Sequence, residues 1–183
     1  MGRFRKALRR AMGRDRTSAA PPGAPVRSAA PQPSVEPVGV PDASGHRLAT
    51  ADELLERLSE GVVVVHHWAT WCAPCLAELP AIDDLAAALP DGVELLGVSW
   101  EAFMGHDTPR SALAATQRFA AGRGGRWASW VVQDAPEAFF DALDLPVQTV
   151  PQTAVYREGQ RVAVWPGPLE QGDAAKVLEA AGA

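Results

Sequence analysis

The chain has only two cysteines among its 183 residues, Cys72 and Cys75, and they lie three positions apart. So few cysteines argue against a disulfide scaffold, which small secreted proteins build from several pairs. A structural zinc site needs four ligands, and the four histidines of the chain do not supply the H-x₃₋₅-H spacing that would complete one. We therefore expect no metal, and we interpret the pair as a site of sulfur chemistry.

Long apolar runs are also missing. No run approaches the ~18 residues that a membrane-spanning helix requires. The basic first residues are not followed by the apolar segment that a signal peptide contains. We therefore expect a cytoplasmic protein without a membrane span.

Positive charge is scarce beyond the first residues. Residues 1–16 carry seven Arg or Lys and one Asp, a net charge of +6, whereas the whole chain carries −5, which leaves −11 for the remainder. An acidic body argues against nucleic acid as a partner.

The composition divides the chain into three parts. Residues 1–16 form a basic tail with Phe4, Leu8 and Met12 at helical spacing, and the pattern favours a solvated tail; the alternative is weak contact of residues 3–14 with a membrane surface or an acidic partner. Residues 17–45 contain seven prolines among Ala, Ser and Gly, which predicts a disordered linker. Residues 46–183 form the folded domain.

Within the domain, β-branched apolar runs alternate with segments of helical apolar spacing. The expected strands cover residues 62–68, 93–100 and 127–133, followed by a hairpin of 152–157 and 161–165. The expected helices cover residues 51–60, 76–89, 109–121, 136–143 and 174–181. This order predicts an α/β fold: a three-layer sandwich with a mixed central sheet.

The position of the cysteines predicts their chemistry. A buried strand precedes them and an amphipathic helix follows, so they belong to the first turn of that helix, where backbone N–H groups favour an anion. Such a site can lower a thiol pKa from ~8.5 into the range ~3.5–7.5. Cys72 is nearer the helix start and more exposed, so we expect it to attack. Cys75 then resolves the mixed disulfide, and Pro74 stiffens the turn between them.

The segment W-A-T-W-C-A-P-C at 68–75 resembles the active site of the thioredoxin superfamily, and specifically its TlpA-like branch of thiol–disulfide oxidoreductases. Three further features support the branch. The cysteines continue as C-L-A-E-L-P at 75–80, V-P-Q-T at 150–153 resembles the cis-proline loop, and the strand and helix at 127–143 match an insertion. The resemblance covers residues 48–183 and implies a thioredoxin-like fold. That branch is usually exported, which stands against the cytoplasmic location expected above.

The resemblance implies a substrate-contacting surface around the cysteines. It implies a cis bond before Pro151, which leaves the backbone of Val150 to pair with an extended substrate peptide. From sequence alone a trans proline would be the expectation. Trp71 would form an exposed apolar shoulder, with Ala73 and Pro74 between the cysteines completing the contact surface.

Two residues are candidates for proton transfer with Cys75. Glu78 matches the family's acid, and burial would raise its pKa; the alternative is a solvated helix glutamate. His66 is a departure, since thioredoxins carry Asp at that position and TlpA-like proteins often carry Asn. Its imidazole could accept a proton near neutral pH, or it could be a hydrogen-bonded core residue.

The sequence thus predicts a thiol–disulfide oxidoreductase that acts on protein disulfides, requires no cofactor and works as a monomer with an unidentified redox partner. A thiol peroxidase of the same fold is one alternative, although neither cysteine has the Thr three residues earlier that peroxiredoxins carry. A partner-binding module with little turnover is another.

Overall fold

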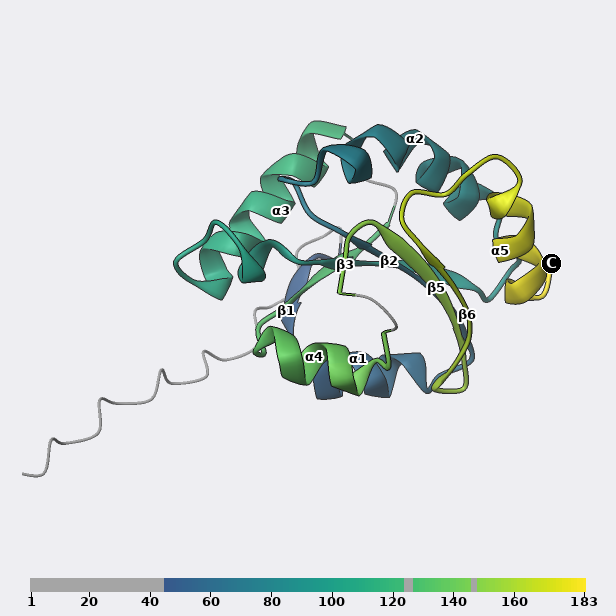
Figure 1. Cartoon of the computed structure of the whole chain (residues 1–183), viewed down its shortest axis with the longest axis horizontal. Coiled ribbons are helices and arrows are strands. Elements are labelled where there is room, and N and C mark those ends of the chain that lie inside the picture. Colours follow the sequence, from purple (N-terminus) through teal and green to yellow (C-terminus); the bar gives the residue numbers. More distant parts are fainter. Residues whose placement is uncertain (1–44, 124–126, 146–147) are drawn as a thin grey trace, which may run out of the picture. The chain divides into compact units, whose positions relative to one another are not determined.

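The computed structural model describes residues 45–123, 127–145 and 148–183. The predictions for the basic tail and, apart from Gly45, for the linker lie outside these residues. The described part forms one six-stranded sheet in the order β1-β4-β3-β2-β5-β6, with helices on both faces (Figure 1). The predicted three-layer α/β fold is confirmed.

The sheet is mixed, as predicted. Its strands are β1 (Arg47–Ala49), β2 (Val62–Trp68), β3 (Glu94–Ser99), β4 (Ser129–Val132), β5 (Gln152–Arg157) and β6 (Gln160–Pro166). The first four run parallel to one another, whereas β5 is antiparallel to β2, and β6 is antiparallel to β5. The sequence prediction missed β1, a three-residue strand that begins with a charged residue and pairs only with β4.

The helices are α1 (Ala51–Leu58), α2 (Ala73–Ala88), α3 (Pro109–Arg123), α4 (Pro136–Ala142) and α5 (Asp173–Ala181), with a short 3₁₀ helix, η1, at Glu101–Phe103. In Figure 1, α1 and α4 lie below the sheet, and α2, α3 and α5 lie above it. The predicted capping box of α1 is present, because Thr50 accepts the N–H of Glu53 and the Glu53 carboxylate accepts the N–H of Thr50. None of the helices in the described ranges is long and apolar enough to cross a bilayer.

Strand β2 is the centre of the core. Val63, Val64 and Val65 are fully buried, because β3 and β5 flank the strand and helices cover both of its faces. Alternate side chains enter two different clusters: Val63 and Val65 pack on the side of α1 and α4, whereas Val64 packs with Ile82 of α2 on the other side. This burial fixes the end of β2, where the chain turns into the cysteine segment.

Candidate active site

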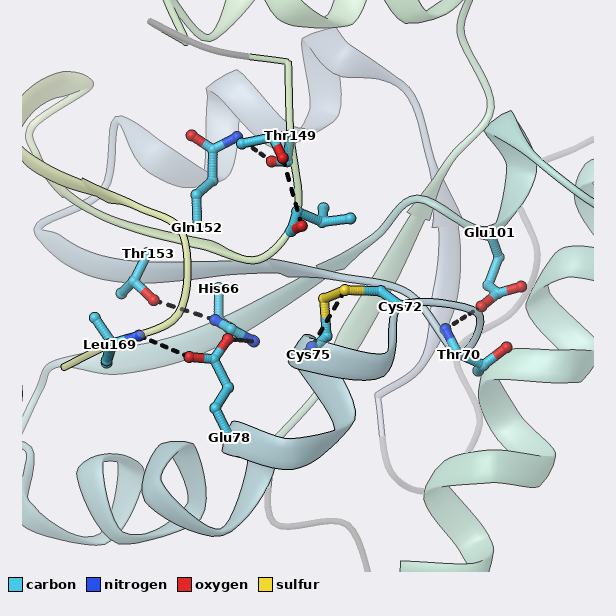
Figure 2. The surroundings of a disulfide bond; sticks show 11 residues. His66, Thr70, Cys72, Cys75, Glu78, Glu101, Thr149, Gln152, Thr153 and Leu169 are labelled. Atoms are coloured by element: carbon cyan, nitrogen blue, oxygen red, sulfur yellow. Dashed lines mark hydrogen bonds and ion pairs between the residues drawn. A yellow bond between two sulfur atoms is a disulfide. The ribbon is translucent and has the colours of Figure 1, made fainter.

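The two cysteines form a disulfide at the start of α2 (Figure 2). Cys72 is the N-cap of the helix, one position earlier than the first-turn placement predicted from sequence, and Cys75 lies in the first turn. The N–H of Cys75 donates to Sγ of Cys72 over 3.2 Å. Cys72 is 5% exposed and Cys75 is fully buried. Of the two cysteines, only Cys72 therefore keeps any exposed surface.

This geometry suits a thiolate at Cys72. After reduction, Sγ of Cys72 occupies the capping position in which a helix N-terminus offers free N–H groups to an anion. A hydrogen bond to the charged form lowers the pKa of the group that accepts it. Cys75, one turn deeper and without exposed surface, is placed to attack Cys72 rather than an external disulfide.

Glu78 and His66 lie on the Cys75 side of the disulfide (Figure 2). The Glu78 side chain is nearly buried, and its Oε2 accepts the N–H of Leu169 over 2.8 Å. His66 is fully buried on β2, and its Nδ1 lies 3.1 Å from Oγ1 of Thr153 on β5. The remaining atoms of the pair, Oε1 of Glu78 and Nε2 of His66, face each other at 3.6 Å. Each of these two buried atoms has no hydrogen-bond partner of its own.

Burial shifts the pKa values of this pair in opposite directions. Desolvation raises the pKa of Glu78 above its ordinary value, although the Leu169 N–H partly offsets the effect. Desolvation lowers the pKa of His66 to about 3, so its imidazole is neutral at neutral pH. Glu78 is thus the member of the pair that burial favours in its protonated form, and a protonated Glu78 would have Nε2 of His66 as the acceptor nearest to its Oε1.

His67 lies on the opposite face of β2, where its Nδ1 accepts the indole N–H of Trp100 over 3.2 Å. Burial lowers its pKa to about 3, with a smaller contribution from His66. The two neighbouring histidines are therefore both neutral in the folded chain at pH values at which the unfolded chain would protonate them.

The buried histidines predict an acid-sensitive fold. Because the unfolded chain binds protons that the folded chain does not, the free energy of unfolding should fall as the pH drops from about 6.5 towards 3. Each histidine should contribute roughly 1 kcal/mol per pH unit in that window. Glu78 acts in the opposite sense, because its raised pKa favours the folded state at low pH. Denaturant titrations at several pH values should show the slope, and His67→Gln should reduce it. An unchanged slope in His67→Gln would contradict this explanation.

The predicted substrate-contacting residues surround Cys72. Trp71 is 42% exposed, and Ala73 and Pro74 are also exposed. The Val150–Pro151 bond is cis, as the resemblance implied. Thr149 O accepts from Nε2 of Gln152 over 2.9 Å, which ties the loop before Pro151 to the start of β5.

An apolar groove adjoins these residues. Its lining comes from the cysteine segment, the chain around η1, α4 and the loop before Pro151: Trp71, Trp100, Phe103, Met104, Pro136, Phe140, Gln148, Thr149 and Val150. Among the described residues, three large apolar side chains are exposed, and two of them, Trp71 and Met104, line this groove. The groove thus continues the predicted substrate-contacting surface from Trp71 and Val150 towards η1 and α4.

Two residues near the site were missed from sequence. Leu169, in the loop between β6 and α5, binds Glu78 through its backbone, and no side-chain pattern could indicate that contact. Glu101 is a fully buried carboxylate that accepts the N–H of Thr70, two residues before Cys72. The sequence did contain a signal for Glu101. It closely follows a buried strand that is parallel to β2, and the carboxyl ends of parallel strands lie at the same edge of the sheet as the cysteines. Within the described ranges, no group of three or more His, Cys, Asp or Glu side chains could hold a metal ion.

The fold and the site define a class: a thioredoxin-like domain with a CxxC disulfide at a helix N-terminus, beside a cis-proline. Comparisons with known proteins agree. Residues 47–105 match the family model Thioredoxin. The thiol:disulfide interchange protein DsbE homolog of Paracoccus denitrificans is 39% identical over 98 residues, which are 51% of this chain and 50% of that protein. The thiol-disulfide oxidoreductase ResA of Oceanobacillus iheyensis is 50% identical over 38 residues, 20% of each chain.

Solved structures agree on the fold. A thioredoxin-related protein from Neisseria meningitidis serogroup B superposes with a TM-score of 0.53 at 22% identity, covering 66% of this chain and 84% of that one. A DsbF homologue from Corynebacterium diphtheriae gives 0.52 at 24% identity, covering 68% and 74%. Residues 47–105 thus carry a thioredoxin domain, and the chain is similar to the DsbE- and ResA-type proteins over the stretches that these matches cover. It spans half or less of the length of these two curated relatives.

Proposed function

We propose that the protein is a thiol–disulfide oxidoreductase that acts on protein disulfides. The observation that carries the proposal is the Cys72–Cys75 disulfide, with one sulfur buried and the other capping α2 beside the Val150–Pro151 loop. The names of the DsbE and ResA relatives support the same reaction class.

The reaction starts from the reduced dithiol. The Cys72 thiolate attacks one sulfur of a substrate disulfide, forms a mixed disulfide and releases the other substrate sulfur as a thiolate, which takes a proton from water. Cys75 then loses its proton and attacks Sγ of Cys72, which releases the second substrate sulfur. The substrate gains two electrons, and the chain ends with the Cys72–Cys75 disulfide. A second dithiol protein must reduce that disulfide again, and the reverse sequence would oxidise a substrate dithiol.

Glu78 is the proposed proton acceptor for Cys75. Its nearly buried carboxylate has a raised pKa, so it can take the thiol proton and stay neutral in an apolar site. His66 is neutral and is proposed to steady the protonated acid through its Nε2, 3.6 Å from Oε1 of Glu78. This role differs from the proton acceptor expected from sequence, because a histidine with a pKa of about 3 is a weak base.

A protein substrate suits the surface around Cys72. The apolar groove and the exposed Trp71 extend the contact surface beyond the cysteines, and the backbone of Val150, which lines the groove, is proposed to pair with an extended peptide. The peroxidase alternative is not favoured by any contact of the site. The cytoplasmic location and the monomeric state stay predictions.

The equilibrium potential of the Cys72/Cys75 pair tests the proposal. Tryptophan fluorescence should follow the titration in glutathione or dithiothreitol buffers, because Trp68 and Trp71 lie in the same segment as the cysteines. We expect one two-electron transition, at about −270 mV for a cytoplasmic reductase. A value of about −180 mV would contradict the cytoplasmic location but remain consistent with an oxidoreductase. No transition, with a signal equal to that of a variant lacking both cysteines, would leave only the partner-binding module.

A further inference from the structure

The end of β2 and the turn that follows it are held at two points by the first residues after β3. Trp100 N–H donates to Trp68 O over 2.9 Å, and the N–H of Thr70 donates to Oε1 of Glu101. Figure 2 shows Glu101 and Thr70 on one side of the disulfide, with His66 and Glu78 on the other. The chain therefore approaches Cys72 along a turn that is attached to the first residues after β3.

Glu101 is an unusual residue for this place. It is fully buried, and a buried carboxylate is costly unless charge-assisted hydrogen bonds compensate for the lost water. It has two such bonds: the Thr70 N–H at Oε1 and Nε2 of His106 at Oε2, the latter at 2.7 Å. Its own N–H lies 3.4 Å from Oγ of Ser99. The His106 tautomer with its proton on Nε2 is the one that donates to a carboxylate oxygen.

A short turn connects the residue that the Glu101 carboxylate binds, Thr70, to the attacking Cys72. Thr70 precedes Cys72 by two residues, and Cys72 N–H donates to Ala69 O over 3.2 Å, so these residues form one short turn. The turn sets where Sγ of Cys72 lies relative to the N–H of Cys75, 3.2 Å away. In the oxidised chain the disulfide itself restrains Sγ, but after reduction only the non-covalent contacts remain.

We propose that Glu101 is a positioning residue for Cys72: its carboxylate, held by His106, accepts the Thr70 N–H and keeps the reduced turn in the geometry that places Sγ at the start of α2. His106 orients the carboxylate from the loop between η1 and α3. The proposal rests on the proposed function for its purpose, whereas the geometry it describes is independent of any substrate.

The test is the pH profile of alkylation of the reduced full-length chain by iodoacetamide, with mass spectrometry to confirm modification at Cys72. Two comparisons separate the effect of the hydrogen bond to the Thr70 N–H from the effect of the negative charge of Glu101. Glu101→Ala and Glu101→Gln both lack the negative charge, but only Gln keeps an oxygen that can accept the Thr70 N–H. Glu101→Asp keeps the charge of the natural chain, but its side chain is one methylene too short to make the same contact.

We expect the midpoint of Glu101→Ala to lie at least about half a pH unit above that of Glu101→Gln, because a thiolate that leaves the helix start loses its donors. Glu101→Asp should lie above the natural chain by a similar amount. Equal midpoints within both pairs would overturn the proposal, even if the variants are less stable. If Glu101→Ala does not fold, the comparison of Glu101→Asp with the natural chain decides alone. The alkylation profile needs no substrate, so it tests the positioning role of Glu101 separately from the proposed function. A chain that showed no disulfide exchange would refute the proposed function, and the alkylation midpoints would still decide the role of Glu101.

Discussion

Cys75→Ser is expected to accumulate a stable mixed disulfide between Cys72 and a substrate protein. The variant keeps the sulfur that caps α2 and loses only the buried sulfur that would release the substrate. Cys72→Ser should lose disulfide exchange by on the order of 10³-fold or more, the size of loss expected when a nucleophile is removed. Non-reducing electrophoresis after incubation with a disulfide-bonded protein measures both results.

The difference in trapping between Cys75→Ser and Cys72→Ser decides which sulfur attacks the substrate. If Cys72→Ser traps substrate as well as Cys75→Ser does, the assignment of the attacking sulfur is wrong. The double variant controls for non-covalent capture, because a binding module would retain its partner without either sulfur. Adding dithiothreitol should release the trapped substrate from Cys75→Ser, whereas a partner held only by the apolar groove would stay bound.

Glu78→Gln is expected to slow the resolving step by on the order of 10²-fold, the usual contribution of a positioned proton acceptor. In the natural chain the rate should rise with pH as the carboxylate ionises, in a range above the ordinary one because burial raises the pKa of Glu78. The variant should lack this rise. Stopped-flow fluorescence of a preformed mixed disulfide at Cys72 measures the step directly.

Asp84→Asn is the matched control, since it removes an exposed carboxylate from the same helix. Asp84→Asn should leave the pH dependence of the resolving rate unchanged.

The stability of Glu78→Gln provides a second, independent test of the raised pKa. The raised pKa of Glu78 favours the folded state below the ordinary carboxyl range, and that contribution is lost as the pH rises through the folded-state pKa. Glu78→Gln should therefore be more stable than the natural chain at neutral pH. Resolution as fast as in the natural chain at every pH would remove Glu78 from the mechanism.

The parts of the fold that local sequence determines were predictable. The continuous apolar run of β2 indicated a strand buried on both faces, and Thr50 with Glu53 indicated the start of α1. Strand β1 was not predictable, because three residues that pair with a strand far along the chain leave no periodic pattern. The cis bond at Pro151 came from the resemblance, since general frequencies favour trans.

In the candidate site too, the features within one segment were predictable from sequence, and the contacts between distant segments were not. The cysteines and Glu78 lie within one helix, so their spacing was visible in the sequence. The partners that set their surroundings come from elsewhere: Leu169 is 91 residues from Glu78, Thr153 is 87 from His66, and Glu101 is 31 from Thr70. These contacts depend on the order of strands in the sheet, and no local pattern reports that order.

The pairing of β2 with β5 limits where the chain can change length. His66 lies opposite Thr153 and His67 opposite Gln152, so the cysteine segment and Pro151 are connected through a continuous ladder. One inserted residue in either strand would turn alternate side chains to the other face and shift Pro151 by about 3.3 Å along β2. With the pairing of Val62 and Arg157 kept, an insertion in β5 would bring His67 opposite Thr153, and an insertion in β2 would bring Val65 there. Length variation among homologues should therefore concentrate in the loops outside these strands, such as the one between β6 and α5, and spare residues 62–72 and 150–157.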